Sequence, residues 1–372
     1  MKILFDQQIF VSQKYGGISR YFYEIANRMA EMPGHKIQVF APVYVNEYFD
    51  DTSKARPFGI KKPKAIRLTR IVNAINSRLP DLFLKRRKDI DIFHETYYSM
   101  IDNCPASAKR VITVYDMIHE KFPQYFAAGS AEKILQEKVC AIHRADHIIC
   151  ISENTKSDLM QILSVPEEKI SVVHLGCSLK SASLAPDIES PLVSGPFLLY
   201  VGSRVGYKNF ERLIRAYASS EYLKTNFKLV CFGGNEFTID ETSQMQSLNI
   251  PPDRVTQMNG NDDLLTRLYE SAAVFVYPSL YEGFGIPLLE AMSLGCPVAC
   301  ANAGSIPEVA GDAAEFFSPN DSADICAAIT RIAANPGHAS ELVKKGRARA
   351  ELFSWAKCAS ETLNVYQKIL GR

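Results

Sequence analysis

Several features that would place a protein in a membrane or outside the cell are missing from this chain of 372 residues. No charge-free apolar run reaches the length of about 18 residues that a transmembrane helix needs. The opening segment Met1–Asp6 brings in an acidic residue where a secretory signal peptide would continue its apolar stretch. We therefore expect a cytosolic protein.

Cysteine usage argues against a scaffold held by disulfides or zinc. The nine cysteines are an odd number, and none belongs to a Cys-x-x-Cys pair. Reduced and mostly buried thiols fit this pattern best. Because 372 residues, 47% of them hydrophobic, are more than one core usually covers, we expect two well-packed domains.

The net charge of +1 hides one strongly basic stretch, residues 61–88, whose only acidic residue is Asp81. Between Leu68 and Leu79 the apolar residues fall on one helical face and arginines on the other, which predicts a basic amphipathic helix. Such a helix could lie on an anionic membrane surface or pack on its own domain, and the sequence favours neither. Nucleic acid is not expected, because no aromatic residues interleave with the cluster. The basic residues are Lys61, Lys62, Lys64, Arg67, Arg70, Arg78, Lys85, Arg86, Arg87 and Lys88.

Short apolar runs alternate with helical patterns in both halves of the chain, which predicts two α/β domains with doubly wound parallel sheets. A Pro- and Ser-rich linker separates the halves, so the domains are expected at 1–185 and 195–355. Strands are predicted at Lys2–Phe5, Lys36–Phe40, Asp91–Phe93, Arg110–Val114, His147–Ile151 and Lys169–His174, then at Pro196–Val201, Phe227–Phe232, Arg254–Met258, Ala272–Tyr277, Pro297–Ala301 and Ala314–Phe317.

The most informative segment runs from Glu282 to Glu290, directly after the predicted strand Ala272–Tyr277. Gly283 and Gly285 permit a tight turn, so Glu282 belongs to a loop and Glu290 to the helix that follows. Ligands of open α/β sheets bind at the carboxyl ends of the strands, beside helix N-termini that favour anions. Two carboxylates there suit a ligand that carries hydroxyls as well as phosphate, such as a sugar joined to a nucleotide.

This segment resembles the E-x7-E signature of the family 4 glycosyltransferases, which are retaining enzymes with the GT-B fold. The resemblance implies two Rossmann-like domains facing a cleft, with a C-terminal helix at about 356–372 that crosses back to the first domain. It also implies that Glu282 lies by the transferred sugar and that Glu290 binds the ribose hydroxyls. Gly283, Phe284 and Gly285 would line the same site.

A second glycine loop carries two cations at the start of a helix. The strand Pro196–Val201 runs into Gly202, Arg204 and Lys208, which could stabilise the charge on a departing nucleoside diphosphate. A metal ion is then not required, and no Asp-x-Asp motif follows a predicted strand. The family usually has Arg directly after this glycine, whereas Ser203 stands there in this chain.

Three further loops are weaker candidates for the same site. Met258 lies where the family contacts the nucleotide base, and Gly233–Gly234 would let the backbone approach the nucleotide. Ser305 and Glu308 match both a helix capping box and a sugar-site feature of the family.

The acceptor side is expected in the first domain. The resemblance places the amides of Gly16 and Gly17, after the first strand, against the diphosphate or the acceptor. Asp116 retains the place of an acidic residue that many relatives carry, while His119 could supply an imidazole from the next loop. His94, after the predicted strand Asp91–Phe93, is a second histidine candidate.

Together these features predict transfer of a hexose from a nucleotide diphosphate to a hydroxyl, with no cofactor or metal, and the family resemblance implies that the configuration is retained. Several phrases, among them Gly16–Tyr21, resemble bacterial surface-polysaccharide enzymes, so GDP-mannose is the expected donor. The expected acceptor is a saccharide, free or on a polyprenyl diphosphate. An acceptor on a polyprenyl diphosphate would give the basic stretch a purpose, by holding the enzyme at the inner membrane face.

Three alternatives stay open at this stage. A nucleotide-sugar epimerase of similar shape would bind the same donor without an acceptor. A nicotinamide dehydrogenase is less favoured, because no Gly-x-Gly-x-x-Gly follows the first strand. A non-catalytic member of a polysaccharide-assembly complex would have no need of intact Glu282, Lys208 and Glu290.

Overall fold

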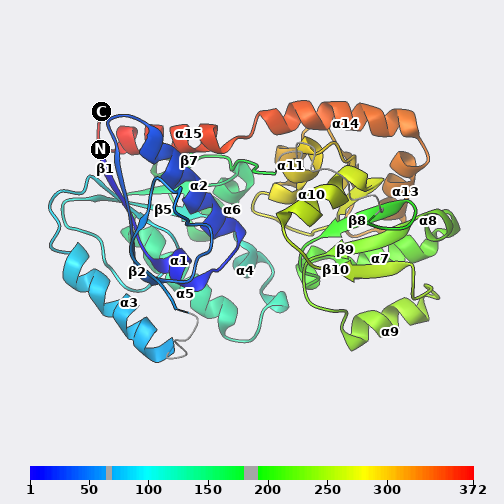
Figure 1. Ribbon diagram of the computed structural model, residues 1–372, viewed down its shortest axis with the longest axis horizontal. Helices are drawn as coiled ribbons and strands as arrows, with labels where there is room; N and C mark the ends of the chain where they lie inside the picture. Colours follow the sequence, from blue (N-terminus) through cyan, green and yellow to red (C-terminus); the bar gives the residue numbers. More distant parts are fainter. Residues whose placement is uncertain (64–68, 180–191) are drawn as a thin grey trace. The chain divides into compact units, whose positions relative to one another are not determined.

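The structure, a computed structural model, describes residues 1–63, 69–179 and 192–372 (Figure 1). The chain folds as two units, one made of Met1–Gly176 and Trp355–Arg372 and the other of Cys177–Ser354. The sequence boundaries at 185 and 195 lie at or beside residues 180–191, which are outside the described part. None of the described helices is both long and apolar enough to cross a membrane.

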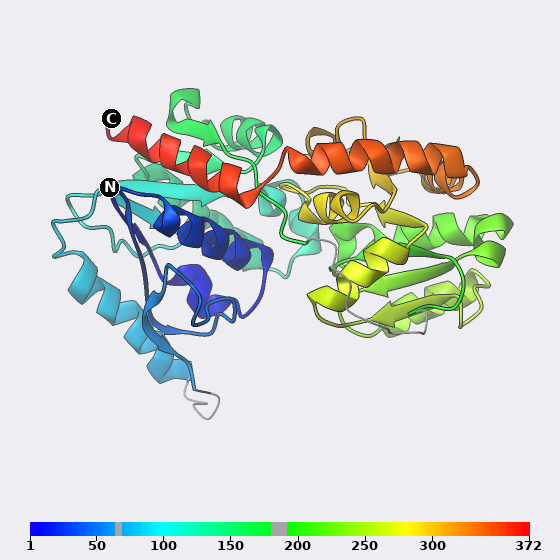
Figure 2. The same cartoon turned by 45° about the horizontal axis from the view of Figure 1, so that its top comes forward.

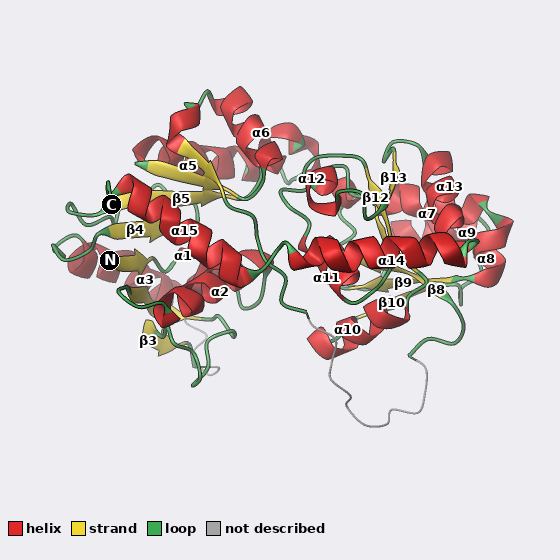
Figure 3. Ribbon diagram, turned by 90° about the horizontal axis from the view of Figure 1, so that it is seen from above, coloured by secondary structure: helices red, strands yellow, loops and turns green. Residues whose placement is uncertain are grey.

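The first unit is built on a parallel sheet of seven strands in the order β3-β2-β1-β4-β5-β6-β7. Figure 3 shows helices on both of its faces, as expected for a parallel sheet. The strands are β1 (Lys2–Phe5), β2 (Lys36–Tyr44), β3 (Pro57–Lys61), β4 (Ile92–Glu95), β5 (Lys109–Val114), β6 (His147–Cys150) and β7 (Ile170–Val172). The helices are α1 (Gln8–Ser12), α2 (Gly17–Glu31), α3 (Thr69–Leu84), α4 (Ile118–Lys121), α5 (Ser130–Arg144), α6 (Glu153–Leu163) and α15 (Trp355–Ile369).

Helix α15 completes this unit from the far end of the sequence. It lies along α2, where the buried ring of Trp355 stands 6.3 Å from that of Tyr21 (Figure 2). The buried Tyr366 reaches the core side chain of His94 on β4. The buried face of α15, from Trp355 to Tyr366, is thus part of the hydrophobic core of the first unit.

The structure corrects the expectations for residues 36–88. β2 continues to Tyr44, and an edge strand, β3, was not predicted. Helix α3 packs on its own domain: the buried Asn76 amide bonds both backbone groups of Val43 on β2, at 3.0 and 2.9 Å. Arg67 and Leu68 of the predicted basic helix lie outside the described residues.

The second unit repeats the plan with six parallel strands in the order β10-β9-β8-β11-β12-β13. All four residues of β11 are buried, as in a central strand covered on both faces. The strands are β8 (Phe197–Val201), β9 (Lys228–Phe232), β10 (Val255–Met258), β11 (Val274–Tyr277), β12 (Val298–Ala301) and β13 (Glu315–Phe317). The helices are α7 (Phe210–Ser219), α8 (Glu221–Asn226), α9 (Ile239–Ser247), α10 (Asp262–Ser271), α11 (Ile286–Ser293), α12 (Ile306–Ala310), α13 (Ser322–Ala333) and α14 (Pro336–Glu351).

Both sheets share the strand order of a dinucleotide-binding fold, with the first strand of each half beside the fourth. The prediction of two doubly wound parallel sheets is confirmed. In such sheets the crevice at the carboxyl ends, where the strand order reverses, is the usual ligand site. In the second unit this point lies between β8 and β11, whose following loops carry Lys208 and Glu282.

Candidate active site

Lys208 and Glu282 meet at the point where the strand order of the second unit reverses. Lys208 ends the short 3₁₀ turn Gly206–Lys208 after β8, and Glu282 lies in the loop after β11. The Lys208 ammonium donates to Glu282 Oε1 at 2.7 Å, and the two side chains are 18% and 13% exposed. The loops that sequence patterns singled out separately are therefore joined by a largely buried ion pair.

Asn209 fixes the Lys208 side of this pair. It adopts the left-handed conformation, with φ 61°, at the start of α7. Its buried side-chain amide donates to the carbonyls of Pro278 and Pro319, at 2.9 and 2.7 Å. These bonds tie the β8 loop to the loops that follow β11 and β13.

Ser305 fixes the Glu282 side. Its hydroxyl donates to the carbonyls of Glu282 and Phe284, at 2.9 and 3.0 Å. At Gly304, with φ 57°, a Cβ atom would come within 3.1 Å of the Glu282 carbonyl oxygen. The predicted capping box of Ser305 and Glu308 is wrong, because the Ser305 side chain makes no capping hydrogen bond with α12.

Each of the two carboxylates lies next to a buried tyrosine: Tyr277 beside Glu282 and Tyr269 beside Glu290. Burial and the adjacent Glu282 carboxylate raise the pKa of Tyr277 well above its ordinary value. The hydroxyl of Tyr269 on α10 donates to Glu290 Oε2 at 3.4 Å, and burial and Glu290 raise the pKa of Tyr269 likewise. Both phenols thus stay protonated and can donate to a carboxylate. Glu290 lies on α11 and is 7% exposed.

Arg204 has partners other than the diphosphate that the sequence suggests. Its side chain is 5% exposed, and its Nε donates to Glu241 Oε1 at 2.7 Å. Its Nη2 donates to the Asn235 carbonyl at 2.6 Å, and the guanidinium lies 4.7 Å from the centre of the Phe237 ring. In this structure Arg204 holds the loop after β9 to the loop after β8, and its predicted contact with phosphate stays a prediction.

The weaker glycine candidates lie together at the same sheet edge. The Gly202 amide donates to the Phe232 carbonyl at 2.9 Å, and the Gly233 amide donates to the Met258 carbonyl at 2.9 Å. Gly233 and Gly234 have φ angles of 90° and 74°, which favour glycine. The ends of β8, β9 and β10 therefore form one continuous backbone edge beside the Lys208–Glu282 pair.

Gly283, Phe284 and Gly285 form the turn between Glu282 and α11. Phe284 is 3% exposed and packs on Phe353, with ring centres 5.8 Å apart. Gly285 has φ 102° and begins α11, so the turn needs glycine there. The turn is thus anchored by an apolar side chain and leaves Glu282 at its outer end.

In the first unit Asp116 and His119 follow β5 together. Asp116 Oδ1 accepts from the Ile118 amide at 3.1 Å. Burial lowers the pKa of His119, the nearby Asp116 opposes this, and the Lys138 charge adds to it, so the imidazole is held neutral. Fully buried Lys138 donates to the Asp116 carbonyl at 2.9 Å and pairs with Glu120 at 2.8 Å. This buried ion pair, which the sequence did not reveal, supports the loop.

Gly16 and Gly17 lie at the start of α2. Gln13 Oε1 accepts from the Ser19 amide at 3.3 Å, and a Cβ atom at Gly16 would approach that oxygen to 2.5 Å. Gly17 is exposed. The helix N-terminus is therefore open at Gly17, which is compatible with the predicted anion contact.

His94 is a core residue rather than a site residue. It lies within β4 and is fully buried, with Nε2 2.9 Å from Thr113 Oγ1 and Nδ1 bonded to the Tyr366 hydroxyl. Burial lowers the pKa of His94 to about 3, so the ring is neutral. A substrate has no access to it.

The described residues contain no group of three or more His, Cys, Asp or Glu side chains placed to hold a metal ion. Asn209 and Tyr269 were missed by sequence reasoning. Asn209 follows Lys208 directly, and an asparagine before a helix is a signal for a left-handed residue. Tyr269 had no signal, because its contact with Glu290 depends on how α10 packs against α11.

Two family profiles match the chain, one for each unit. Residues 15–181 match the family described as Glycosyltransferase Family 4, and residues 188–349 match Glycosyl transferases group 1. The chain belongs to the family 4 glycosyltransferases. It is similar to O-antigen chain mannosyltransferase B of Escherichia coli, with 28% identity over 99% of this chain and 100% of the relative.

A second relative of this glycosyltransferase is the MMP alpha-(1->4)-mannosyltransferase of Mycolicibacterium hassiacum, 26% identical over 96% of each chain. Among solved structures it is similar to WaaG, a glycosyltransferase involved in lipopolysaccharide biosynthesis, with a TM-score of 0.74, 18% identity and full coverage of both chains. At this identity the structural likeness shows the fold, which is GT-B.

Proposed function

We propose that this glycosyltransferase transfers mannose from GDP-mannose to a hydroxyl of a saccharide or lipid-linked saccharide in bacterial surface-polysaccharide synthesis. The transfer retains the anomeric configuration and needs no metal ion. The observation that carries the proposal is the Lys208–Glu282 pair, 2.7 Å apart where β8 and β11 end, with Glu290 on the adjoining helix. The choice of mannose rests on the two relatives named as mannosyltransferases.

The Lys208–Glu282 pair resolves the conflict between a carboxylate and a phosphate ligand in one site. The Lys208 and Glu282 side chains are only 18% and 13% exposed, so an unpaired charge on either would be costly. When no donor is bound, the Lys208 ammonium neutralises the Glu282 carboxylate. The donor's phosphates compete for Lys208, and Glu282 is then released to accept hydrogen bonds from sugar hydroxyls. Lys208 would gain the most from the leaving diphosphate, whose charge grows as the glycosidic bond breaks.

In the proposed reaction the acceptor oxygen forms a bond to the anomeric carbon while the bond from that carbon to the diphosphate oxygen breaks. The acceptor's proton passes to an oxygen of the departing phosphate on the same face, so no protein nucleophile takes part. A covalent route would require a second carboxyl about 5–5.5 Å from Glu282. The Glu282 carboxylate is paired with the Lys208 ammonium. Asp116 and His119 would bind acceptor hydroxyls.

The test is transfer by the purified enzyme, followed by NMR, with GDP- and UDP-sugars and a saccharide acceptor, in the presence of a chelator. Lys208→Met should lower kcat about 100- to 1000-fold, as loss of one charge-stabilising donor typically does. Glu290→Ala should mainly raise KM for the donor. Lys224→Met removes a pair with Glu221 at 2.9 Å elsewhere in the unit and should leave both constants unchanged.

Three results would contradict the proposal. Wild-type kinetics in both Lys208→Met and Glu290→Ala would show that the site is elsewhere. Conversion of the donor sugar without an acceptor would indicate an epimerase. Inverted configuration in the product would exclude the same-face route.

A further inference from the structure

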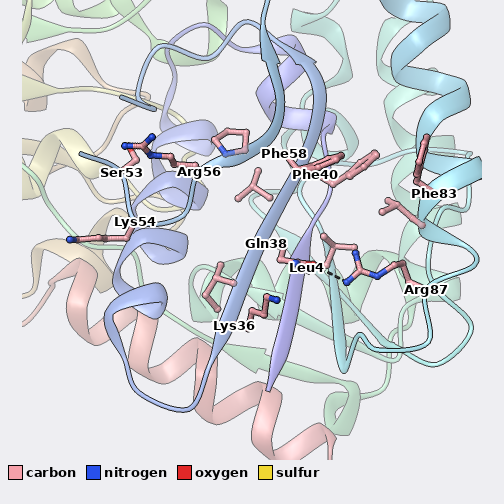
Figure 4. A pocket seen from close by; sticks show the side chains of 14 residues that line it. Leu4, Lys36, Gln38, Phe40, Ser53, Lys54, Arg56, Phe58, Phe83 and Arg87 are labelled. Atoms are coloured by element: carbon pink, nitrogen blue, oxygen red, sulfur yellow. Dashed lines mark hydrogen bonds between the residues drawn. The ribbon is translucent and has the colours of Figure 1, made fainter. Parts of the chain in front are cut away.

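An open groove of about 590 Å³ lies in the first unit, between the edge of its sheet and the end of α3 (Figure 4). Its apolar part is formed by Leu4 on β1, Phe40 on β2, Phe58 on β3, and Phe83 and Leu84 on α3. The volume is within the range of about 300–1,000 Å³ that small-ligand sites have. No residue assigned to the transfer reaction contributes to it.

The groove exists because α3 leaves the edge of the sheet uncovered. Parallel sheets normally have helices on both faces, yet Phe58 on edge strand β3 is 73% exposed and Phe83 is 56% exposed. Phe58 stacks on the buried Phe40 with ring centres 5.9 Å apart, so its exposed ring extends the core outward. Ile60, two residues further along β3 on the same face, is 61% exposed. A continuous apolar strip of this kind is typical of an interaction site.

Four cations and no acid are found among the described residues that line the groove. Figure 4 shows Lys36, Lys54 and Arg56 along one side and Arg87 near Phe83. Arg87 also pairs with Asp89, a neighbour outside the lining. Within the described part of the chain, the ammonium groups of Lys36 and Lys54 form no ion pair. The groove therefore combines an apolar floor with available positive charge.

We propose that this groove docks the enzyme on an anionic bilayer, with Phe58 and Phe83 among the acyl chains and Lys36 and Lys54 at the lipid phosphates. The charge pattern selects the occupant. An amphipathic surface gains affinity from buried apolar area and from attraction to anionic lipids. A second copy of the chain fits poorly, because a two-fold interface would set the same cations against each other.

The proposed membrane contact differs from the amphipathic face that the sequence suggests between Leu68 and Leu79. Val72 and Leu84 of α3 are buried against their own domain, whereas Phe83 in its last turn is 56% exposed. The inserted side chains would come from β3 and the last turn of α3. This inference does not depend on the proposed sugar donor or reaction.

The experiment is flotation of the full chain with vesicles of phosphatidylcholine alone or mixed with phosphatidylglycerol. The wild type should bind the mixed vesicles, and added salt should weaken binding. Lys36→Gln combined with Lys54→Gln should lower the affinity about 25-fold, from about fivefold for each lysine at an anionic surface. Lys344→Gln combined with Lys345→Gln, on α14, removes the same charge elsewhere and should have no effect.

The apolar arm uses Phe58→Ser, which should weaken binding to the mixed vesicles. Its control is Ile239→Ser, which removes an 85% exposed side chain from the second unit. Phe58→Trp provides an independent readout, since the chain's one tryptophan, Trp355, is buried. Its fluorescence should shift to the blue with mixed vesicles, and brominated acyl chains should quench it.

Several outcomes would overturn the proposal: no vesicle binding by the wild type, or unchanged binding by the double lysine variant or by Phe58→Ser. Loss of self-association in Phe58→Ser, with vesicle binding intact, would assign the groove to a second copy. Loss of transfer to a lipid-linked acceptor in detergent, again with vesicle binding intact, would assign it to the acceptor's chain. Failure of the proposed transfer is separable, because the groove variants should act on a water-soluble acceptor at the wild-type rate.

Discussion

Replacing His94 with glutamine should remove a defined part of the pH dependence of the first unit's stability. The His94 ring is fully buried between Thr113 and Tyr366, and burial lowers its pKa to about 3. In the unfolded chain a histidine has a pKa of about 6.5. Since the folded value is depressed, the stabilising effect of the neutral ring is complete above the unfolded pKa and is lost as the pH falls below it.

The size of the effect follows from these two values. Between pH 7 and pH 5 the unfolded chain takes up about 0.7 proton at this position and the folded chain almost none. Linkage then lowers the free energy of unfolding by about 2 kcal/mol over this interval. Because the folded pKa lies far below pH 5, the loss depends almost entirely on the unfolded pKa. Between pH 7 and pH 5 the free energy of unfolding of His94→Gln should therefore fall by about 2 kcal/mol less than that of the wild type.

The assay is urea unfolding at pH 7 and pH 5, followed by tryptophan fluorescence. Trp355 is the only tryptophan and packs on Tyr21, so the signal reports the first unit. Tyr366→Phe is the matched control. It removes one hydrogen bond to the ring and should cost about 1 kcal/mol at both pH values, while the pH dependence persists. Equal pH dependence in the wild type and His94→Gln would refute the reasoning.

Three more predictions concern the second unit, each measured by urea unfolding. Ser305→Ala removes the hydroxyl donor to the carbonyls of Glu282 and Phe284, and should cost about 1–3 kcal/mol while lowering kcat; unchanged turnover would show that these two bonds do not affect the function of Glu282. Asn209→Ala should be about 1–2 kcal/mol less stable than Asn209→Gly, because alanine disfavours the left-handed φ of 61°; equal stabilities would contradict this. Arg204→Lys should cost about 1.5–3 kcal/mol through its hydrogen bonds to Glu241, and retention of wild-type stability would show that these bonds are dispensable.

Sequence predicted the elements well where burial is complete. The four residues of β11 are all buried, so the run Val274–Tyr277 reads as a central strand without further information. The edge strand β3 was missed because Pro57–Lys61 contains proline, glycine and lysine, and its apolar residues face outward. An edge strand lacks the continuous apolar signal of a buried one.

The candidate site was predictable in its residues but less so in its contacts. Glu282 and Lys208 came from strand-end loops, and the sheet order brings those loops together. The partner of Arg204 is Glu241, and nothing in their spacing indicates that contact. The capping box predicted for Ser305 does not form, because its backbone has φ −80° and ψ −5°, whereas a capping residue needs extended angles.

The core of the first unit combines residues from both ends of the chain. This affects the order in which the two units can fold during synthesis. At about 5–20 residues per second, synthesis of the remaining half of the chain takes about 10–40 s after Gly176. Throughout that time Tyr21 lacks the cover of Trp355, and His94 lacks the Tyr366 hydroxyl. The second unit, a continuous segment, can complete its fold earlier. The unit whose synthesis begins first is thus completed last. A ribosome that stops before residue 355 releases a first unit whose core lacks the side chains of α15.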